Sequence, residues 1–213
     1  MRSGSPGQRW WVGLAVGSVL LAALVTVPWL LTRPAPQAGG AAPVGAAPAA
    51  TGVVAPGPDV PVSRPVSLDI PAIELARSPL GELGLNPDGT VEVPVDFATA
   101  GWFDLGPTPG QVGASVLLGH VDSTTGPAVF FRLRSLEAGD LVEVGLADGT
   151  VARFAVGSVE TYPKAEFPAR RVYTSVGSRD LRLVTCGGEF DPVSRSYESN
   201  VVVYATLVDT VPA

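Results

Sequence analysis

The sequence predicts a mostly β domain, a closed or nearly closed β-barrel of seven or eight strands with short helices, preceded by one membrane-spanning helix. Three observations lead to this prediction: an uncharged apolar run over residues 10–31, a tract rich in Pro, Ala and Gly over residues 32–65, and short runs of β-branched residues separated by turn signals over residues 66–213. An apolar run of about 20 residues is long enough for a membrane helix, and many short strands are typical of a barrel.

The membrane anchor is predicted at residues 10–31, which carry no charge and place tryptophans near both ends. At 1.5 Å per residue, a helix of this length covers the roughly 30 Å hydrocarbon layer of a bilayer. Arg2 and Arg9 precede the run, and Arg33 follows it. This balance favours a cytoplasmic N-terminus over residues 1–9 and an extracytoplasmic C-terminal body. A cleaved signal peptide is the alternative, although its apolar core has only about 7–15 residues.

Residues 32–65 form a low-complexity tract that is almost free of charge. Repeated Pro and Gly interrupt helices and sheet ladders, so we expect a semi-extended passive spacer. The remaining segment, residues 66–213, is long enough to bury a single core.

The predicted strands are rich in β-branched residues and are bounded by turn signals. They are Val66–Ile70, Thr90–Val93, Ala114–Gly119, Leu141–Leu146, Thr150–Glu160, Leu181–Thr185 and Asn200–Val208. Asp148-Gly149 predicts a hairpin turn, and the turn signal at residues 86–89 is expected just before a strand. Short helical turns are expected around Phe97–Phe103 and Ala128–Ser135.

The charge pattern argues against a nucleic-acid partner. The net charge is −6 and the basic residues are scattered, whereas nucleic-acid binding proteins cluster Lys and Arg to displace counterions from phosphate groups. One His, one Cys and dispersed carboxylates cannot supply a four-ligand zinc site, and the chain has no phosphate or dinucleotide motif. We therefore expect neither a metal nor a cofactor.

Cys186 is the only cysteine and His120 the only histidine, and each directly follows a predicted apolar strand. A thiol attacks a carbonyl as its thiolate, and an imidazole nearby can serve as its proton-transfer partner. The alternative is a buried, inert thiol and a structural imidazole. In an oxidising compartment, where cysteines are usually paired, a single thiol is either buried or kept for its reactivity.

Three neighbouring residues extend this candidate site. Gly187 and Gly188 follow Cys186 directly, so their backbone N–H groups could face an oxyanion, or the two glycines could merely form a turn. Arg195 lies beyond the following loop, where a guanidinium could bind an oxyanion or the substrate backbone. A solvated loop arginine is an equally good interpretation of its spacing.

The segments around these residues resemble the sortase family. LLGHVDS at Leu117–Ser123 and LRLVTCGGEFD at Leu181–Asp191 are similar to the His and Cys motifs of sortases. The stretches at residues 100–123, 126–144 and 162–168 look like the actinobacterial class F branch. The resemblance covers nearly all of residues 66–208.

This resemblance implies an eight-stranded sortase barrel with a Cys–His–Arg active site. Cys186 would attack the Thr–Gly bond of an LPxTG-like sorting signal in a secreted protein and form a thioacyl enzyme. His120 would protonate the leaving amine and later accept a proton from the incoming amine. The acceptor would be a peptidoglycan precursor of a Gram-positive cell wall or a pilin-type Lys. Arg195 would stabilise the oxyanion, although its match to the motif is looser.

Two further residues belong to the matched motifs. Asp122 is expected to form a turn or to support His120 indirectly, and Thr185 is expected to shape the pocket beside the thiol. The layout of anchor, spacer and domain also resembles the family's usual arrangement.

Three alternative functions remain open. L,D-transpeptidases are also exported and β-rich, but they place a His two residues before the Cys, whereas His120 and Cys186 lie 66 positions apart (186 minus 120). A hydrolase would use the same groups and admit water in place of an amine. A non-enzymatic surface module would keep Cys186 buried and inert.

Overall fold

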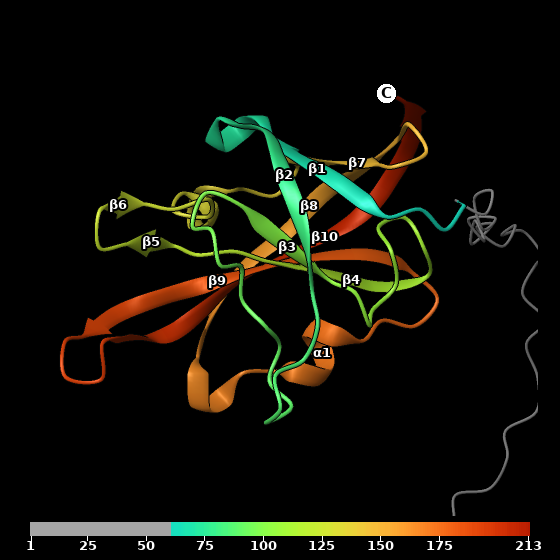
Figure 1. Ribbon diagram of the computed structural model, residues 1–213. Coiled ribbons are helices and arrows are strands. Elements are labelled where there is room, and N and C mark those ends of the chain that lie inside the picture. Colours follow the sequence, from blue (N-terminus) through green and yellow to red (C-terminus); the bar gives the residue numbers. More distant parts are fainter. Residues whose placement is uncertain (1–60) are drawn as a thin grey trace, which may run out of the picture. The chain divides into compact units, whose positions relative to one another are not determined.

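The computed structural model describes residues 61–213, whose backbone forms a closed β-barrel (Figure 1). The barrel order is β1, β2, β3, β4, β9, β10, β8, β7. These strands are β1 (Pro65–Ile70), β2 (Leu75–Leu83), β3 (Ala100–Phe103), β4 (Gly113–Leu118), β7 (Leu141–Leu146), β8 (Thr150–Pro163), β9 (Arg179–Asp191) and β10 (Ser196–Pro212). Outside the barrel, residues 61–213 form the hairpin β5 (Asp122–Ser123) and β6 (Gly126–Pro127), and the short helices η1 (Pro71–Ile73), η2 (Leu133–Ser135), η3 (Lys164–Glu166) and α1 (Ala169–Tyr173). The predicted mostly β, eight-stranded barrel is confirmed.

The β7–β8 hairpin follows directly from the sequence. Half-buried and buried residues alternate along β7, and its Leu141 pairs with Ala155 of β8 in an antiparallel ladder. Gly149 closes the turn with a φ of 83°, a left-handed conformation that glycine adopts without steric cost. The hairpin predicted from Asp148-Gly149 is confirmed.

Two local predictions are wrong. Thr90–Val93 is not a strand, because Val91 forms only an isolated bridge with Leu85 and Pro94, which cannot donate to a ladder, follows directly. Ala100–Phe103, expected within a helical turn, is strand β3, because alternating residues on this short segment pack against the barrel core.

Other predictions are confirmed only in part. The helical turn expected at residues 128–135 contains η2 at its end. Strand β2 has no counterpart in the prediction, because Pro79, Gly81 and several polar residues interrupt its apolar pattern. Strands β9 and β10 extend well beyond the predicted Leu181–Thr185 and Asn200–Val208, and together form a long hairpin.

The pairing of β4 with β9 positions the functional residues. The two strands are parallel, and Leu118 of β4 pairs with Val184 of β9. Because parallel strands end at the same edge of a sheet, the residues that follow β4 meet the C-terminal half of β9. Backbone pairing continues one residue past β4, since the Gly119 N–H donates to the Val184 carbonyl at 3.1 Å.

The inner and outer faces of these strands have different environments. Leu181, Leu183 and Val203 lie in the core inside the barrel. Side chains alternate along a strand, so their neighbours Val184 and Val202 lie outside, in a second apolar cluster. That cluster contains Val172 of α1, which covers part of the outer face; in Figure 1 α1 lies below the strands.

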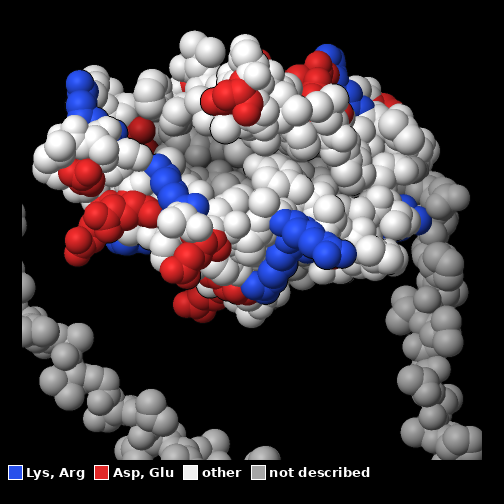
Figure 2. All heavy atoms as spheres, turned by 90° about the horizontal axis from the view of Figure 1, so that it is seen from below, with Lys and Arg blue, Asp and Glu red and all other residues white. Residues whose placement is uncertain are grey.

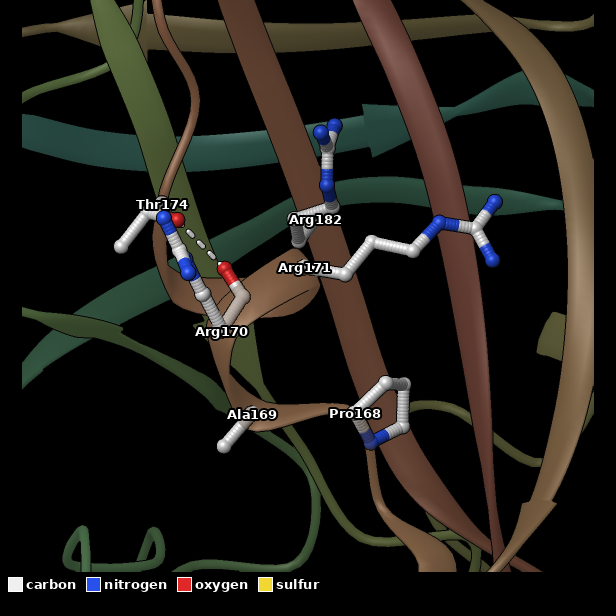
Figure 3. Close-up of a pocket in the computed structure, with 6 residues that line it drawn as sticks. All are labelled: Pro168, Ala169, Arg170, Arg171, Thr174 and Arg182. Atoms are coloured by element: carbon white, nitrogen blue, oxygen red, sulfur yellow. Dashed lines mark hydrogen bonds between the residues drawn. The ribbon is translucent and has the colours of Figure 1, made fainter.

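Polar contacts also attach α1 to the barrel. Arg171 donates to both carboxylate oxygens of Glu160 on β8, at 2.6 Å each, and its guanidinium lies 4.2 Å from the centroid of the Tyr204 ring. Figure 3 shows the Arg171 side chain extending from α1 across the neighbouring strands. Arg171 and Arg182 both line a pocket beside α1, and Arg182 is paired with Asp180 at 3.0 Å. Because both guanidinium groups are paired with carboxylates, these two arginines have a structural role in this pocket.

Replacing Glu160 with Gln should lower the free energy of unfolding by about 1 kcal/mol at pH 7, because it removes a partly exposed ion pair. Hydrogen bonds from Arg171 and Tyr162 lower the pKa of Glu160 from its ordinary value of 4.5 to about 2. A lowered carboxylate pKa stabilises the fold above the unfolded pKa, so the difference from wild type should shrink below about pH 4.5 and vanish below about pH 2. Urea unfolding across this range measures it. Glu198→Gln, at an exposed carboxylate of β10, is the control, and a difference that does not depend on pH would contradict the assignment.

The predicted anchor at residues 10–31 and the predicted spacer, apart from its last residues, lie outside the described residues. Among residues 61–213, no helix combines the length and the apolar composition needed to cross a membrane.

Candidate active site

Cys186 lies on the outer face of β9. It is two residues beyond Val184, which belongs to the outer cluster, so both side chains leave the strand on the same side. The thiol is half-buried and lines two pockets. The arrangement differs from that of an inert thiol sealed in a core.

The structure brings His120 and Cys186 together. Leu118 and Val184 are paired on neighbouring parallel strands, and His120 and Cys186 each lie two residues further along the same outer face. Both residues line one pocket of about 420 Å³, which we call the His120 pocket. The only imidazole and the only thiol of the chain therefore share one open site.

Asn200 lies on the other side of Cys186. It is the residue of β10 directly opposite Cys186 in the antiparallel β9–β10 ladder, and it also lines the His120 pocket. Because β9 lies between β4 and β10, the order across the sheet is His120, Cys186, Asn200. We call these three residues the His–Cys–Asn row. Asn200 is not among the site residues predicted from the sequence, although an Asn beside a run of β-branched strand residues is a signal for it.

The His120 ring is held by the segment between β2 and β3. Its Nε2 lies 2.7 Å from the carbonyl oxygen of Pro94. A carbonyl only accepts, so this contact assigns a proton to Nε2 and leaves Nδ1 as the nitrogen that can exchange a proton with substrate. Phe97 stacks on the ring with centroids 4.3 Å apart. Gly119 is required before His120, because a Cβ there would lie 2.6 Å from the Phe130 ring.

Within the described part of the chain, the lining of the His120 pocket contains no acidic residue, lysine or arginine. Phe167, Ala169 and Tyr173 contribute from the segment that contains α1. Figure 2, which views the molecule from below, shows a face that is uncharged over its middle, with charged side chains mostly around the margin.

A second pocket, of about 560 Å³, meets the first at Cys186 and Thr185. We call it the Arg134 pocket, because Arg134 and Arg132 line it; Arg132 is paired with Glu74. Thr185 is almost fully buried, and among residues 61–213 its hydroxyl has no hydrogen-bond partner. As predicted, Thr185 borders the pocket beside the thiol.

Close contacts with β10 explain why the two residues after Cys186 are glycines. A Cβ on Gly187 would lie 2.6 Å from a methyl of Val201, and one on Gly188 would lie 2.7 Å from the Ser199 hydroxyl. Gly188 also has a φ of 78°. Both glycines line the Arg134 pocket, and their role toward an oxyanion stays a prediction.

Asp122 links two hairpins beside the site. On β5 it accepts a hydrogen bond from the Tyr197 hydroxyl of β10, and Tyr197 lines the Arg134 pocket with Cys186. In Figure 1 the β5–β6 and β9–β10 hairpins project from the same side of the barrel. The hydrogen bond to Asp122 raises the pKa of the Tyr197 phenol, and burial and the nearby Cys186 add to the shift. This contact reaches Tyr197 and not His120, so the indirect support of His120 by Asp122 stays a prediction.

Arg195 is not brought to the thiol. It lies in the exposed turn between β9 and β10, with a φ of 53°, and it lines neither pocket that contains Cys186. Asn200, which faces Cys186, is five residues further along β10, or roughly 16 Å at about 3.3 Å per residue. The catalytic role of Arg195 stays a prediction that this geometry does not support.

A family model described as the sortase domain matches residues 68–208. The chain belongs to the sortase family. This membership makes it a sortase-type cysteine transpeptidase, an enzyme class that acts on sorting signals and amine acceptors. Its assignment to the class F branch stays a prediction. No curated protein sequence matches the chain.

Solved sortase structures share the fold of this sortase. A SrtA sortase from Actinomyces oris matches with a TM-score of 0.54 and 22% identity, covering 75% of this chain and 89% of that one. Sortase A from Listeria monocytogenes matches with 0.53 and 16%, covering 72% and 92%. Sortase C1 from Streptococcus agalactiae matches with 0.52 and 20%, covering 68% and 67%. At these identities the likeness shows the fold alone.

Proposed function

We propose that this sortase cleaves an LPxTG-like sorting signal between Thr and Gly through a thioacyl intermediate on Cys186, and transfers the acyl group to an amine. The observation that carries the proposal is the meeting of Cys186 and His120, the only thiol and the only imidazole, in the open His120 pocket. The lining of this pocket, which has no acidic residue, lysine or arginine among residues 61–213, suits the apolar Leu-Pro part of such a signal.

The proposed reaction has two acyl transfers. The Cys186 thiolate attacks the threonine carbonyl carbon, a C–S bond forms, and the C–N bond to glycine breaks as Nδ1 of the His120 imidazolium gives its proton to the leaving amine. An acceptor amine then attacks the thioester and loses a proton to His120. The C–S bond breaks, and the thiolate is regenerated.

We further propose that residues 10–31 anchor the enzyme in the cell membrane in a single pass, with the catalytic domain extracytoplasmic. The support is the uncharged apolar run with positive charge before it. The acceptor would then be a peptidoglycan precursor of a Gram-positive cell wall or a pilin-type Lys. Detergent-free fractionation tests the anchor, because mature protein in the soluble fraction would contradict it.

The experiment that tests the activity incubates the detergent-solubilised full chain with a peptide library of sorting-signal type and reads the products by mass spectrometry. We expect cleavage after Thr, and with an added oligoglycine amine we expect the ligated peptide to replace the hydrolysed one. Cleavage that ignores the amine would identify a thiol hydrolase. No cleavage of any peptide would contradict the proposal.

A further inference from the structure

We propose that Asn200, and not an arginine, is the side chain that binds the carbonyl oxygen of the scissile bond when Cys186 attacks. The inference rests on the proposed function and names a catalytic residue for it. Its basis is the His–Cys–Asn row, in which Asn200 is the polar side chain on the far side of the thiol from His120.

The strand register places the Asn200 amide beside the thiol. Residues directly opposite each other in an antiparallel pair have Cβ atoms about 4.5–5.5 Å apart and side chains on the same face. Asn200 and Cys186 are such a pair, and both line the His120 pocket. Among residues 61–213, no hydrogen bond engages the Asn200 amide, so both of its N–H donors are available to a ligand.

The His–Cys–Asn row places the groups for two steps of acyl transfer, proton exchange with the amine and binding of the carbonyl oxygen, on opposite sides of Cys186. His120 lies on one side of Cys186, where it exchanges a proton with the amine. Attack by the thiolate moves negative charge onto the carbonyl oxygen, which needs a fixed donor away from the amine. Asn200, on the opposite side, can provide that donor while the departing amine keeps access to His120.

The placement of the arginines favours the same assignment. Arg195 is in the hairpin turn, roughly 16 Å along β10 from the residue that faces the thiol. Arg132 and Arg134 line the Arg134 pocket, and neither lines the His120 pocket, in which Cys186 and His120 meet. Asn200 is the side chain with N–H donors that shares the His120 pocket with Cys186 and His120.

The position of Asn200 also argues for a function. Asn is disfavoured in strands relative to β-branched residues, yet this one precedes Val201, Val202 and Val203 inside a long ladder. A ligand at Cys186 would accept hydrogen bonds from an Asn200 side-chain amide that makes none within residues 61–213.

The test measures single-turnover thioacyl formation and steady-state kcat and KM with a cleaved sorting peptide, using the full chain. We expect Asn200→Ala to lower kcat by about 10²–10³-fold with KM changed little, the pattern of a contact made mainly in the transition state. Asn200→Asp keeps the shape, removes the N–H donors and adds a negative charge, so it should lose at least as much.

The controls separate this inference from simpler explanations. Ser199→Ala changes the neighbouring residue, which lines neither pocket, and should keep kcat within about twofold. Arg195→Ala and Arg134→Ala should each lower kcat less than Asn200→Ala. Thermal unfolding of each variant checks the fold.

Two results would overturn the inference. In the first, the wild type is active, but the Asn200 variants keep their kcat or lose no more of it than Arg195→Ala does. The proposed function would then stand, and Asn200 would have no role in the mechanism. A wild type that cleaves no sorting peptide removes both proposals together.

Discussion

Cys186→Ala is expected to abolish peptide turnover and thioacyl formation while the barrel remains folded. The chain has no other cysteine that could replace the nucleophile, and the thiolate is the group that attacks. Because the sulfur is only half-buried at the junction of two pockets, its removal should change the free energy of unfolding by less than about 1 kcal/mol. Intact-mass spectrometry with a sorting peptide and urea unfolding measure the two effects.

A thiol-directed sulfonate reagent provides the matched control. The folded wild type should take up one label, at Cys186, and lose its turnover with the same time course. Cys186→Ala should take up none. Peptide cleavage that persists in Cys186→Ala, or a folded wild type that resists labelling, would show that this thiol is not the nucleophile.

His120→Ala should lower the rate of thioacyl formation from a peptide by about 10²–10⁴-fold, the usual contribution of a general acid. The leaving amine would have to depart without the proton that Nδ1 supplies. The Pro94 carbonyl holds Nε2 and Phe97 holds the ring face, so the imidazole of the wild type is oriented before substrate arrives. Rapid-quench measurement of the first turnover gives the rate.

Changing the leaving group of the substrate distinguishes a loss of proton transfer in His120→Ala from a packing defect. An activated ester of the same peptide departs without protonation, so His120→Ala should lose much less rate with the ester than with the amide. Thr124→Ala, an exposed change in the β5–β6 segment, controls for local disturbance. Equal losses with both substrates would contradict the general-acid role.

The identity of two site residues could be predicted from the sequence, but their contact could not. His120 and Cys186 each follow an apolar strand and are unique in the chain. Their proximity depends on the parallel pairing of β4 with β9, a long-range choice that short-range alternation does not encode. The resemblance of the two motifs supplied what local pattern could not.

Strand length explains why the site predicted from the sequence does not include Asn200. The sequence interpretation begins the last strand at Asn200, which would make this residue an end of the strand. In the structure β10 begins at Ser196, so Asn200 lies well inside the ladder and faces Cys186. Residues 187–199 do not indicate strands in the sequence, yet the ladder of the hairpin continues to Asp191 and resumes at Ser196, which leaves Arg195 in the turn.

The parallel pairing of β4 with β9 has a consequence for when the enzyme becomes active. Parallel strands cannot be joined by a tight turn, and the intervening segment contains β7, β8 and α1. Long-range pairings of this kind form late and slowly. A newly made chain therefore holds its thiol without a partner until the barrel closes, and catalytic competence should appear together with the final cooperative step of folding.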